Sequence, residues 1–142
     1  MQEYFSNSLE PDEVFCNNSK MSQVKRLSAL DKLYNNMLVL QLKRYTHDEG
    51  ISRKNTKEVQ APFHLTIRKE QTVNMDRDWD YSLAGFICHV GDNLNSGHYI
   101  TYIRKEGKWI CYDDDHVYIL SDTDAKDKAE KAYLFFYQLI QA

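Results

Sequence analysis

A histidine and a run of carboxylates stand at the ends of two neighbouring apolar segments. His98 comes directly before residues 99–103, and residues 113–115, all aspartates, come directly after residues 109–112. Both segments are rich in the β-branched and aromatic residues that favour strands. If the segments pair as a hairpin, an imidazole and a carboxylate lie side by side on one sheet face. Such a carboxylate fixes the tautomer of the ring and stabilises the imidazolium that forms when the other nitrogen takes a proton.

The length of the turn decides which aspartate faces His98. A three-residue turn over residues 105–107, with Gly107 in the left-handed conformation, sets Asp114 opposite the histidine. A four-residue turn shifts the pairing by one residue and sets Asp113 there instead. The Cβ atoms of directly opposite residues lie roughly 4.5–5.5 Å apart, so both alternatives predict a His–Asp dyad. The competing interpretation, a polar strand residue beside a solvated turn, stays open on geometry alone.

None of the three cysteines has the setting of a nucleophile. Cys88 and Cys111 fall inside expected strands, where packing buries a thiol, and Cys16 lies outside the neighbourhood of the dyad. None begins a helix, the position that lowers the pKa of a thiol. Three irregularly spaced cysteines predict neither a disulfide framework nor a four-ligand zinc site, so we expect no metal and no cofactor. A reducing, intracellular compartment, cytoplasm or nucleus, fits this cysteine usage best.

Length and composition predict one folded domain rich in β-structure. The 142 residues suffice for a hydrophobic core, and 10 Tyr, 6 Phe and 2 Trp argue against disorder. The 18 basic and 21 acidic residues give a net charge of −3 without a basic stripe, which excludes a nucleic-acid footprint. No apolar run approaches the ~18 residues of a membrane span. We expect neither nucleic acid nor a membrane among the partners.

The apolar pattern predicts the elements that would position the dyad. We expect strands at residues 37–42, 59–67, 83–90, 99–103 and 109–112. The run 37–42 is continuous rather than alternating, which predicts a buried strand. Residues 46–58 predict a solvated hairpin tip, and residues 122–131 a charged, helix-prone connector. Residues 21–33 carry an apolar side chain at every third position from Val24 and fit a short amphipathic helix.

The segment around the dyad resembles the histidine box of the ubiquitin-specific protease family. The match covers His89-Val90-Gly91-Asp92, Ser96-Gly97-His98-Tyr99, Tyr102, Arg104, residues 107–109, residues 112–114 and Val117. Residues 38–45, Leu-Val-Leu-Gln-Leu-Lys-Arg-Tyr, resemble the family's apolar strand, and residues 132–137, Ala-Tyr-Leu-Phe-Phe-Tyr, its closing strand. The three segments follow the family's order, and the resemblance covers roughly residues 1–139.

The resemblance implies an α+β, papain-like cysteine protease fold with a mainly antiparallel sheet, the palm. Residues 1–142 would form a single partial domain, the C-terminal half of a catalytic domain. Residues 1–36 would be the finger and connector region, which makes residues 21–33 an extended strand, and residues 37–142 the palm with the histidine box. The family's helical thumb and its nucleophile segment, of the type Asn-x-Gly-Asn-Thr-Cys-Tyr, have no counterpart in this sequence. Cys16 falls where many members carry half of a zinc site, but three of the four ligands are missing.

The activity implied by the resemblance is hydrolysis, by a cysteine, of the isopeptide bond at the C-terminus of ubiquitin. His98 would be the general base and then the general acid. Asp113 matches the third member of the triad, with Asp114 as a supporting residue that orders the loop. A narrow channel would hold the terminal Gly-Gly, since only glycine lets a backbone lie between close walls. The residues expected along the ubiquitin tail are Ser96, Gly97 and Tyr99.

The resemblance also implies loops and partners around this site. Residues 46–58 and 91–97 match two loops that close on the ubiquitin tail. The expected partners are ubiquitin or ubiquitinated proteins, and an N-terminal segment or chain that carries the catalytic cysteine. The alternative function is a catalytically inactive ubiquitin-binding or scaffold module that lacks the nucleophile. We assign Tyr102, Trp109 and Tyr112 to sheet packing and His89 to a satisfied histidine of the sheet.

Overall fold

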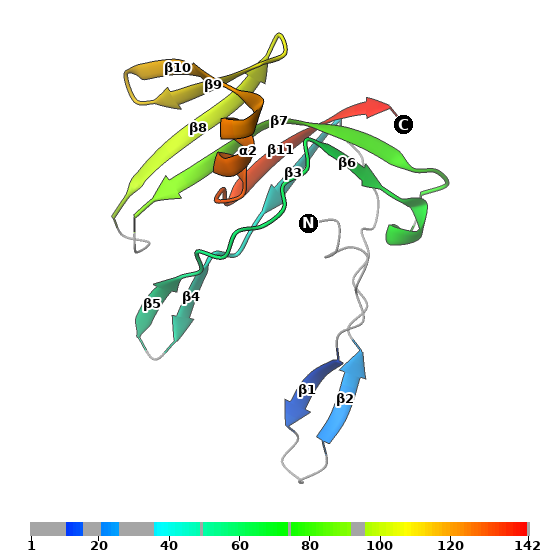
Figure 1. The fold of residues 1–142 in the computed structure, drawn as a ribbon. Coiled ribbons are helices and arrows are strands. Elements are labelled where there is room, and N and C mark those ends of the chain that lie inside the picture. The colour runs from blue at the N-terminus through cyan, green and yellow to red at the C-terminus, as the bar shows by residue number, and fades with distance from the viewer. Residues whose placement is uncertain are drawn as a thin grey trace.

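A seven-stranded antiparallel sheet forms the centre of the protein (Figure 1). The computed structural model describes residues 11–15, 21–25, 36–48, 50–73, 75–91 and 96–141. Within these residues the sheet has the strand order β10-β9-β8-β7-β11-β3, and β6 pairs with the first part of β7. Its strands are β3 (Met37–Gln41), β6 (His64–Ile67), β7 (Trp79–Val90), β8 (His98–Lys105), β9 (Lys108–Asp113), β10 (His116–Leu120) and β11 (Leu134–Gln141).

Two small hairpins and two short helices accompany the sheet in the part of the chain that the structure describes. β1 (Pro11–Phe15) pairs with β2 (Met21–Lys25), and β4 (Tyr45–Asp48) pairs with β5 (Ile51–Lys54). The helices are η1 (Lys69–Gln71), a 3-10 helix, and α2 (Asp122–Ala129). No helix within the described ranges is long and apolar enough to cross a membrane. β2 shows that the amphipathic helix expected from periodicity is wrong for residues 21–25, whereas residues 26–33 lie outside the described part.

One face of the central sheet is covered and holds the core. α2 packs on β7 and β9, where Ala125 and Ala129 are fully buried (Figure 1). The helix begins after Ser121, whose side chain accepts a hydrogen bond from the Asp124 backbone N–H. The expected charged connector is therefore a helix that closes the core. The largest fully buried side chains are Trp109, Tyr81, Tyr137, Phe86, Phe135, Leu65, Ile67, Leu83 and Cys111.

The opposite face of the sheet carries an exposed line of cross-strand neighbours. Pairing aligns Val39, Phe136, Gly85, Ile103, Ile110 and Ile119, which we call the apolar row. Three of its members are well exposed: Val39 by 50%, Ile103 by 42% and Ile119 by 64%. Large exposed apolar patches on soluble proteins often mark interaction sites, so this row is a candidate contact face.

The expectation of a buried strand at residues 37–42 is wrong. β3 pairs only with β11 among the described strands, and its side chains alternate in exposure. Leu38 and Leu40 pack against the core, whereas Met37 and Val39 are exposed. The run is continuously apolar from Met37 to Leu40 because Met37 and Val39, on its outer side, belong to the same face as the apolar row, and Gln41 then interrupts the run. Continuous hydrophobicity thus indicated two apolar sides, of which one is covered in this chain.

The β8–β9 turn has two residues rather than three or four. Lys105 pairs with Lys108, while Glu106 and Gly107 have φ angles of 51° and 78°. Positive φ at both central residues is the signature of a type I′ turn, whose twist suits a two-residue hairpin. Both turn lengths expected from the sequence are therefore wrong. The signal was hidden because Glu106 stands where such turns usually carry Asn, Asp or Gly.

A second tight turn follows β9 directly. Asp114 has a φ of 51°, and His116 pairs with Asp113, so the aspartate run turns the chain back into β10. The sequence pattern did not predict β10. The strand expected over residues 59–67 is confined to His64–Ile67, because Pro62 has no N–H to donate to a ladder.

Candidate active site

His98 and Asp113 stand at the ends of neighbouring strands. His98 is the first residue of β8 and lies opposite Val90, the last residue of β7. Asp113 is the last residue of β9. The imidazole Nε2 of His98 and the carboxylate Oδ1 of Asp113 form a hydrogen bond. Of the two aspartates considered from the sequence, Asp113 is the one that the structure joins to the histidine.

The surroundings of His98 and Asp113 favour the protonated form of the His98 ring. The hydrogen bond to Asp113 raises the pKa of His98 above its ordinary value, and the negative charge of Asp114 acts in the same direction. The two partners are 39% and 36% exposed, so the pair is open to solvent and to a reactant. Because Nε2 faces the carboxylate, Nδ1 is the nitrogen left to exchange a proton. Its neighbour, Asp114 Oδ2, is 3.9 Å away, outside hydrogen-bond distance.

An aromatic hollow lies beside the start of β8. Tyr99, adjacent to His98, is 56% exposed, and its ring centroid lies 4.7 Å from that of His89 and 6.0 Å from that of Tyr133. The hollow has a volume of about 300 Å³ and is lined by Gln41, Leu42, Lys43, Arg44, Tyr45, His89, Tyr99 and Tyr133. Sequence reasoning placed only Tyr99 here. Tyr133 belonged to the closing-strand motif, which was the one available signal for its place in the site.

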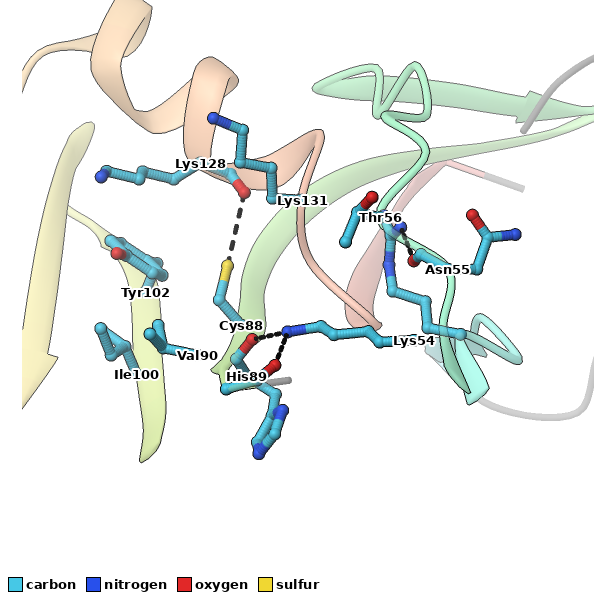
Figure 2. A pocket seen from close by; sticks show the side chains of 12 residues that line it. Lys54, Asn55, Thr56, Cys88, His89, Val90, Ile100, Tyr102, Lys128 and Lys131 are labelled. Carbon is cyan, nitrogen blue, oxygen red and sulfur yellow. Dashed lines mark hydrogen bonds between the residues drawn. The ribbon is translucent and has the colours of Figure 1, made fainter. Parts of the chain in front are cut away.

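The β4–β5 hairpin is tied to the end of β7. Lys54 Nζ donates to the backbone carbonyls of His89 at 2.7 Å and Gly91 at 2.8 Å (Figure 2). The Tyr45 hydroxyl forms a hydrogen bond with Nδ1 of His89. The polar hairpin expected at residues 46–58 is thus attached through its two flanks to the segment that leads into the histidine box.

Arg44 anchors the same hairpin to the chain before β11. Its guanidinium donates to four backbone carbonyls, those of Asn55, Lys57, Glu130 and Ala132, at 2.7–3.2 Å. The side chain is only 6% exposed, and burial lowers the pKa of Arg44. A planar fork of five N–H donors suits several carbonyls at once. Arg44 therefore fixes the backbone next to Tyr45, on one side of the aromatic hollow.

The two described thiols are unsuited to nucleophilic attack. Cys111 is fully buried. Cys88 is 7% exposed, and its Sγ donates to the Lys128 carbonyl at 3.3 Å (Figure 2). Burial raises the pKa of Cys88 to about 11, so its reactive thiolate is scarce at neutral pH. Cys16 lies outside the described residues, and so does the expectation that it binds no zinc.

The remaining site residues frame the entry to β8. Ser96 and Gly97 are exposed, and Gly97 packs against the ring of His89. Residues 92–95 of the expected second loop lie outside the described part. His89 is buried among ring partners, in agreement with a satisfied sheet histidine. Tyr102 and Trp109 are buried as expected of packing residues, whereas Tyr112 is 39% exposed.

Comparisons with known proteins agree on one family. The family model described as "Ubiquitin carboxyl-terminal hydrolase" matches residues 30–137. Ubiquitin carboxyl-terminal hydrolase 4 of Arabidopsis thaliana is 29% identical over 112 residues, 79% of this chain and 31% of the relative. Ubiquitin carboxyl-terminal hydrolase 13 of Homo sapiens is 42% identical over 65 residues, 46% of this chain and 7% of the relative. This chain thus spans about a third or less of these relatives.

Solved structures extend the likeness to the fold. A chain of the SAGA DUB module Ubp8/Sgf11/Sus1/Sgf73 bound to monoubiquitin matches with a TM-score of 0.77 and 30% identity, over 100% of this chain and 33% of that chain. A yeast SAGA DUB module with an Sgf73 mutant matches with a TM-score of 0.76 and 29% identity, over 99% and 32%. The mainly antiparallel sheet, with one α-helix among the described residues, is consistent with the papain-like α+β fold. The chain belongs to the ubiquitin carboxyl-terminal hydrolase family, and its relatives are ubiquitin-specific proteases.

Proposed function

We propose that this chain supplies the histidine, the aspartate and the tail channel of a ubiquitin-directed cysteine hydrolase. The observation that carries the proposal is the hydrogen bond between His98 Nε2 and Asp113, formed beside an aromatic hollow. Family membership gives the reaction class, hydrolysis at the ubiquitin C-terminus. The proposed compartment is intracellular, cytoplasm or nucleus.

The proposed reaction uses the ring of His98 as a proton carrier. Nδ1 takes the proton of a cysteine thiol, and the thiolate attacks the carbonyl carbon of the terminal glycine of ubiquitin. The tetrahedral intermediate collapses, the C–N bond breaks, and the imidazolium protonates the departing lysine amine. A water molecule, deprotonated by the same nitrogen, then hydrolyses the thioester. Asp113 holds the tautomer that keeps Nδ1 free and stabilises the imidazolium.

The hollow beside the dyad would hold the ubiquitin tail. Tyr99 and Tyr133 give it aromatic walls. Ser96 and Gly97, which come directly before His98 and Tyr99 in the chain, would contact the tail as well. A backbone without side chains fits between such walls, which favours a terminal Gly-Gly. A related DUB module has been solved with monoubiquitin bound, which supports ubiquitin as the ligand. In this assignment Asp114 orders the turn beside the reacting nitrogen.

The proposal assigns this chain the C-terminal half of a catalytic domain. Residues 1–36 form the finger and connector region and residues 37–142 the palm. Two observations support the assignment: the chain covers about a third of its solved neighbours, and the apolar row lies exposed. The missing partner is a segment or chain that brings the nucleophilic cysteine, since the described thiols are buried. That partner would cover the apolar row.

The test is covalent capture by ubiquitin that carries a C-terminal thiol-reactive group. The chain is mixed with this probe alone or with a separately supplied N-terminal half that contains the cysteine segment, and intact masses are recorded. We expect an adduct only on the added half, and only while His98 is present. His98→Ala should abolish it, whereas His116→Ala, a change at an exposed histidine paired with Asp115, should not. A His98-dependent adduct on this chain would contradict the assignment.

The second candidate function is a non-catalytic ubiquitin-binding module. The observation in its favour is that both described thiols are buried, and that burial raises the pKa of Cys88 to about 11. Ubiquitin that binds the chain without adduct formation in either mixture would favour this candidate over the hydrolase.

A further inference from the structure

We propose that Tyr45 and His89 form a positioning pair that seats the backbone at Gly97 and so aims the ring of His98. The catalytic consequence rests on the proposed function, whereas the structural consequence does not. Neither residue touches the dyad directly, and the pair acts through the two glycines that border residues 92–96. It is the feature that joins β4 to β7 at the site.

The ring of His89 is held from two sides. The Tyr45 hydroxyl is hydrogen-bonded to Nδ1, and the two rings meet edge to face at 5.8 Å and 71°. The centroid of the Tyr99 ring lies 4.7 Å from that of the imidazole, with the two ring planes inclined at 51°. His89 is only 9% exposed. A ring that is buried, in contact with two aromatic rings and hydrogen-bonded has one orientation, so it can serve as a fixed support.

The supported element is the backbone directly before His98. A Cβ added to Gly97 would collide with Nε2 of His89 and would lie 2.7 Å from the Val90 carbonyl oxygen. A Cβ added to Gly91 would lie 3.2 Å from Cε1 of the same ring. Gly97 therefore lies directly against the imidazole, and Gly91 lies beside Gly97 and close to the same ring. Because Gly97 is bonded to His98, the position of the ring sets where β8 begins.

Burial and a nearby charge determine which atoms of Tyr45 and His89 carry hydrogen. Burial first, and the positive charge of Lys54 second, lower the pKa of His89, so the ring is neutral. Burial raises the pKa of Tyr45, so the phenol keeps its hydrogen. The arrangement that uses this hydrogen has Tyr45 donating to Nδ1, which leaves the ring hydrogen on Nε2, against Gly97. Lys54 holds the backbone carbonyls of His89 and Gly91 and keeps the support in place.

The hydrogen bond, rather than the filled volume, distinguishes this pair from ordinary sheet packing. Phenylalanine at position 45 would keep the ring contacts but lose the hydroxyl that fixes His89. Tyr81 offers a matched control, because it is a buried tyrosine whose hydroxyl has no hydrogen-bond partner among the described residues. Tyr81→Phe removes the same atom from a place where it supports nothing.

The first experiment is kinetic and uses the complete enzyme, this chain together with the segment that carries the cysteine. With ubiquitin bearing a fluorogenic C-terminal amide, Tyr45→Phe should lower kcat by about 10- to 100-fold, because small misplacement of a catalytic group has effects of this size. KM should stay within about twofold, since the walls at Tyr99 and Tyr133 remain. Tyr81→Phe should leave both constants unchanged. An unchanged kcat, or a loss confined to KM, would overturn the proposal.

The second experiment needs no activity and therefore separates this proposal from the proposed function. In the 142-residue chain, ¹⁵N-edited NMR of the imidazoles reports the hydrogen-bonded Nε2–H of His98. Tyr45→Phe should broaden or shift that signal, whereas Tyr81→Phe should not. His89→Asn, whose amide oxygen can replace Nδ1 as acceptor, should disturb it less than His89→Leu. A His98 signal that is identical in all variants would contradict the positioning role even if the enzyme were active.

Discussion

His98 and Asp113 meet across a diagonal of the β8–β9 pair. The paired residues end with Thr101 opposite Tyr112, so one further step would set Ile100, and not His98, opposite Asp113. Diagonal neighbours on one sheet face are within reach of long side chains. The hydrogen bond therefore depends on the turn that holds Asp113 as much as on the strand pairing.

Asp113→Asn should disable the dyad without disturbing the fold. The amide keeps the shape of the side chain but favours the wrong tautomer of His98, so kcat/KM should fall by about 10²- to 10⁴-fold. Asp114→Asn should cost less than tenfold, because Asp114 lies outside hydrogen-bond distance of the ring. Steady-state kinetics of the reconstituted enzyme checks both variants. Equal losses in the two would contradict the assignment of Asp113.

The titration of His98 should follow the same hydrogen bond. Because the bond to Asp113 is the largest cause of the raised pKa, Asp113→Asn should lower the NMR titration midpoint of His98. A raised folded-state pKa stabilises the fold fully below the unfolded value of about 6.5 and loses that effect as the pH rises through the folded-state pKa. The stability difference between wild type and Asp113→Asn should therefore shrink with rising pH. A difference that grows with pH would contradict the raised pKa.

The thiols of Cys88 and Cys111 should resist alkylation in the folded chain. Both are buried, and the pKa of Cys88 is raised to about 11. In a Cys16→Ser background, iodoacetamide at pH 7.5 should modify the folded chain far more slowly than the urea-unfolded chain. Intact mass over time checks this. Equal rates in the two states would show that the strands open readily, and would reopen Cys88 as a nucleophile.

Local pattern was enough to predict the elements that carry the dyad. The apolar segments at residues 83–90, 99–103 and 109–112 are strands, because β-branched and aromatic side chains packed on a sheet decide their conformation. The meeting of a histidine with the aspartate run followed from two strands joined by a short turn. The register did not, since it depends on whether Glu106 accepts a positive φ, and that is decided by the twist of the whole hairpin.

The supports of the site could not be predicted in the same way. Tyr45 meets His89 across 44 residues, and Arg44 meets the Ala132 carbonyl across 88. Neither contact produces a periodic pattern in the sequence, because only the folded sheet brings these segments together. Likewise, the apolar run at residues 37–42, which only Gln41 interrupts, reports two apolar faces but not which of them this chain covers.

The type I′ turn between β8 and β9 offers a stabilising change. Glu106 has a φ of 51°, a conformation that costs most L-residues free energy but that asparagine tolerates. Glu106→Asn should raise the free energy of unfolding by about 0.5–1 kcal/mol. Urea denaturation checks this, with Glu106→Gln as the control that removes the charge alone. A gain in the glutamine variant of the same size would assign the effect to charge rather than to the turn.

The free energy of unfolding should depend strongly on the guanidinium of Arg44. Four backbone carbonyls accept from this one group, and the buried side chain has no carboxylate partner among the described residues. Arg44→Lys keeps the charge but reaches fewer carbonyls, so it should lower the free energy of unfolding by roughly 3 kcal/mol. Lys43→Ala, at the exposed neighbouring residue, should change it by less than about 0.5 kcal/mol. Urea denaturation measures both, and a lysine variant as stable as wild type would show that charge, and not the planar fork, anchors the hairpin.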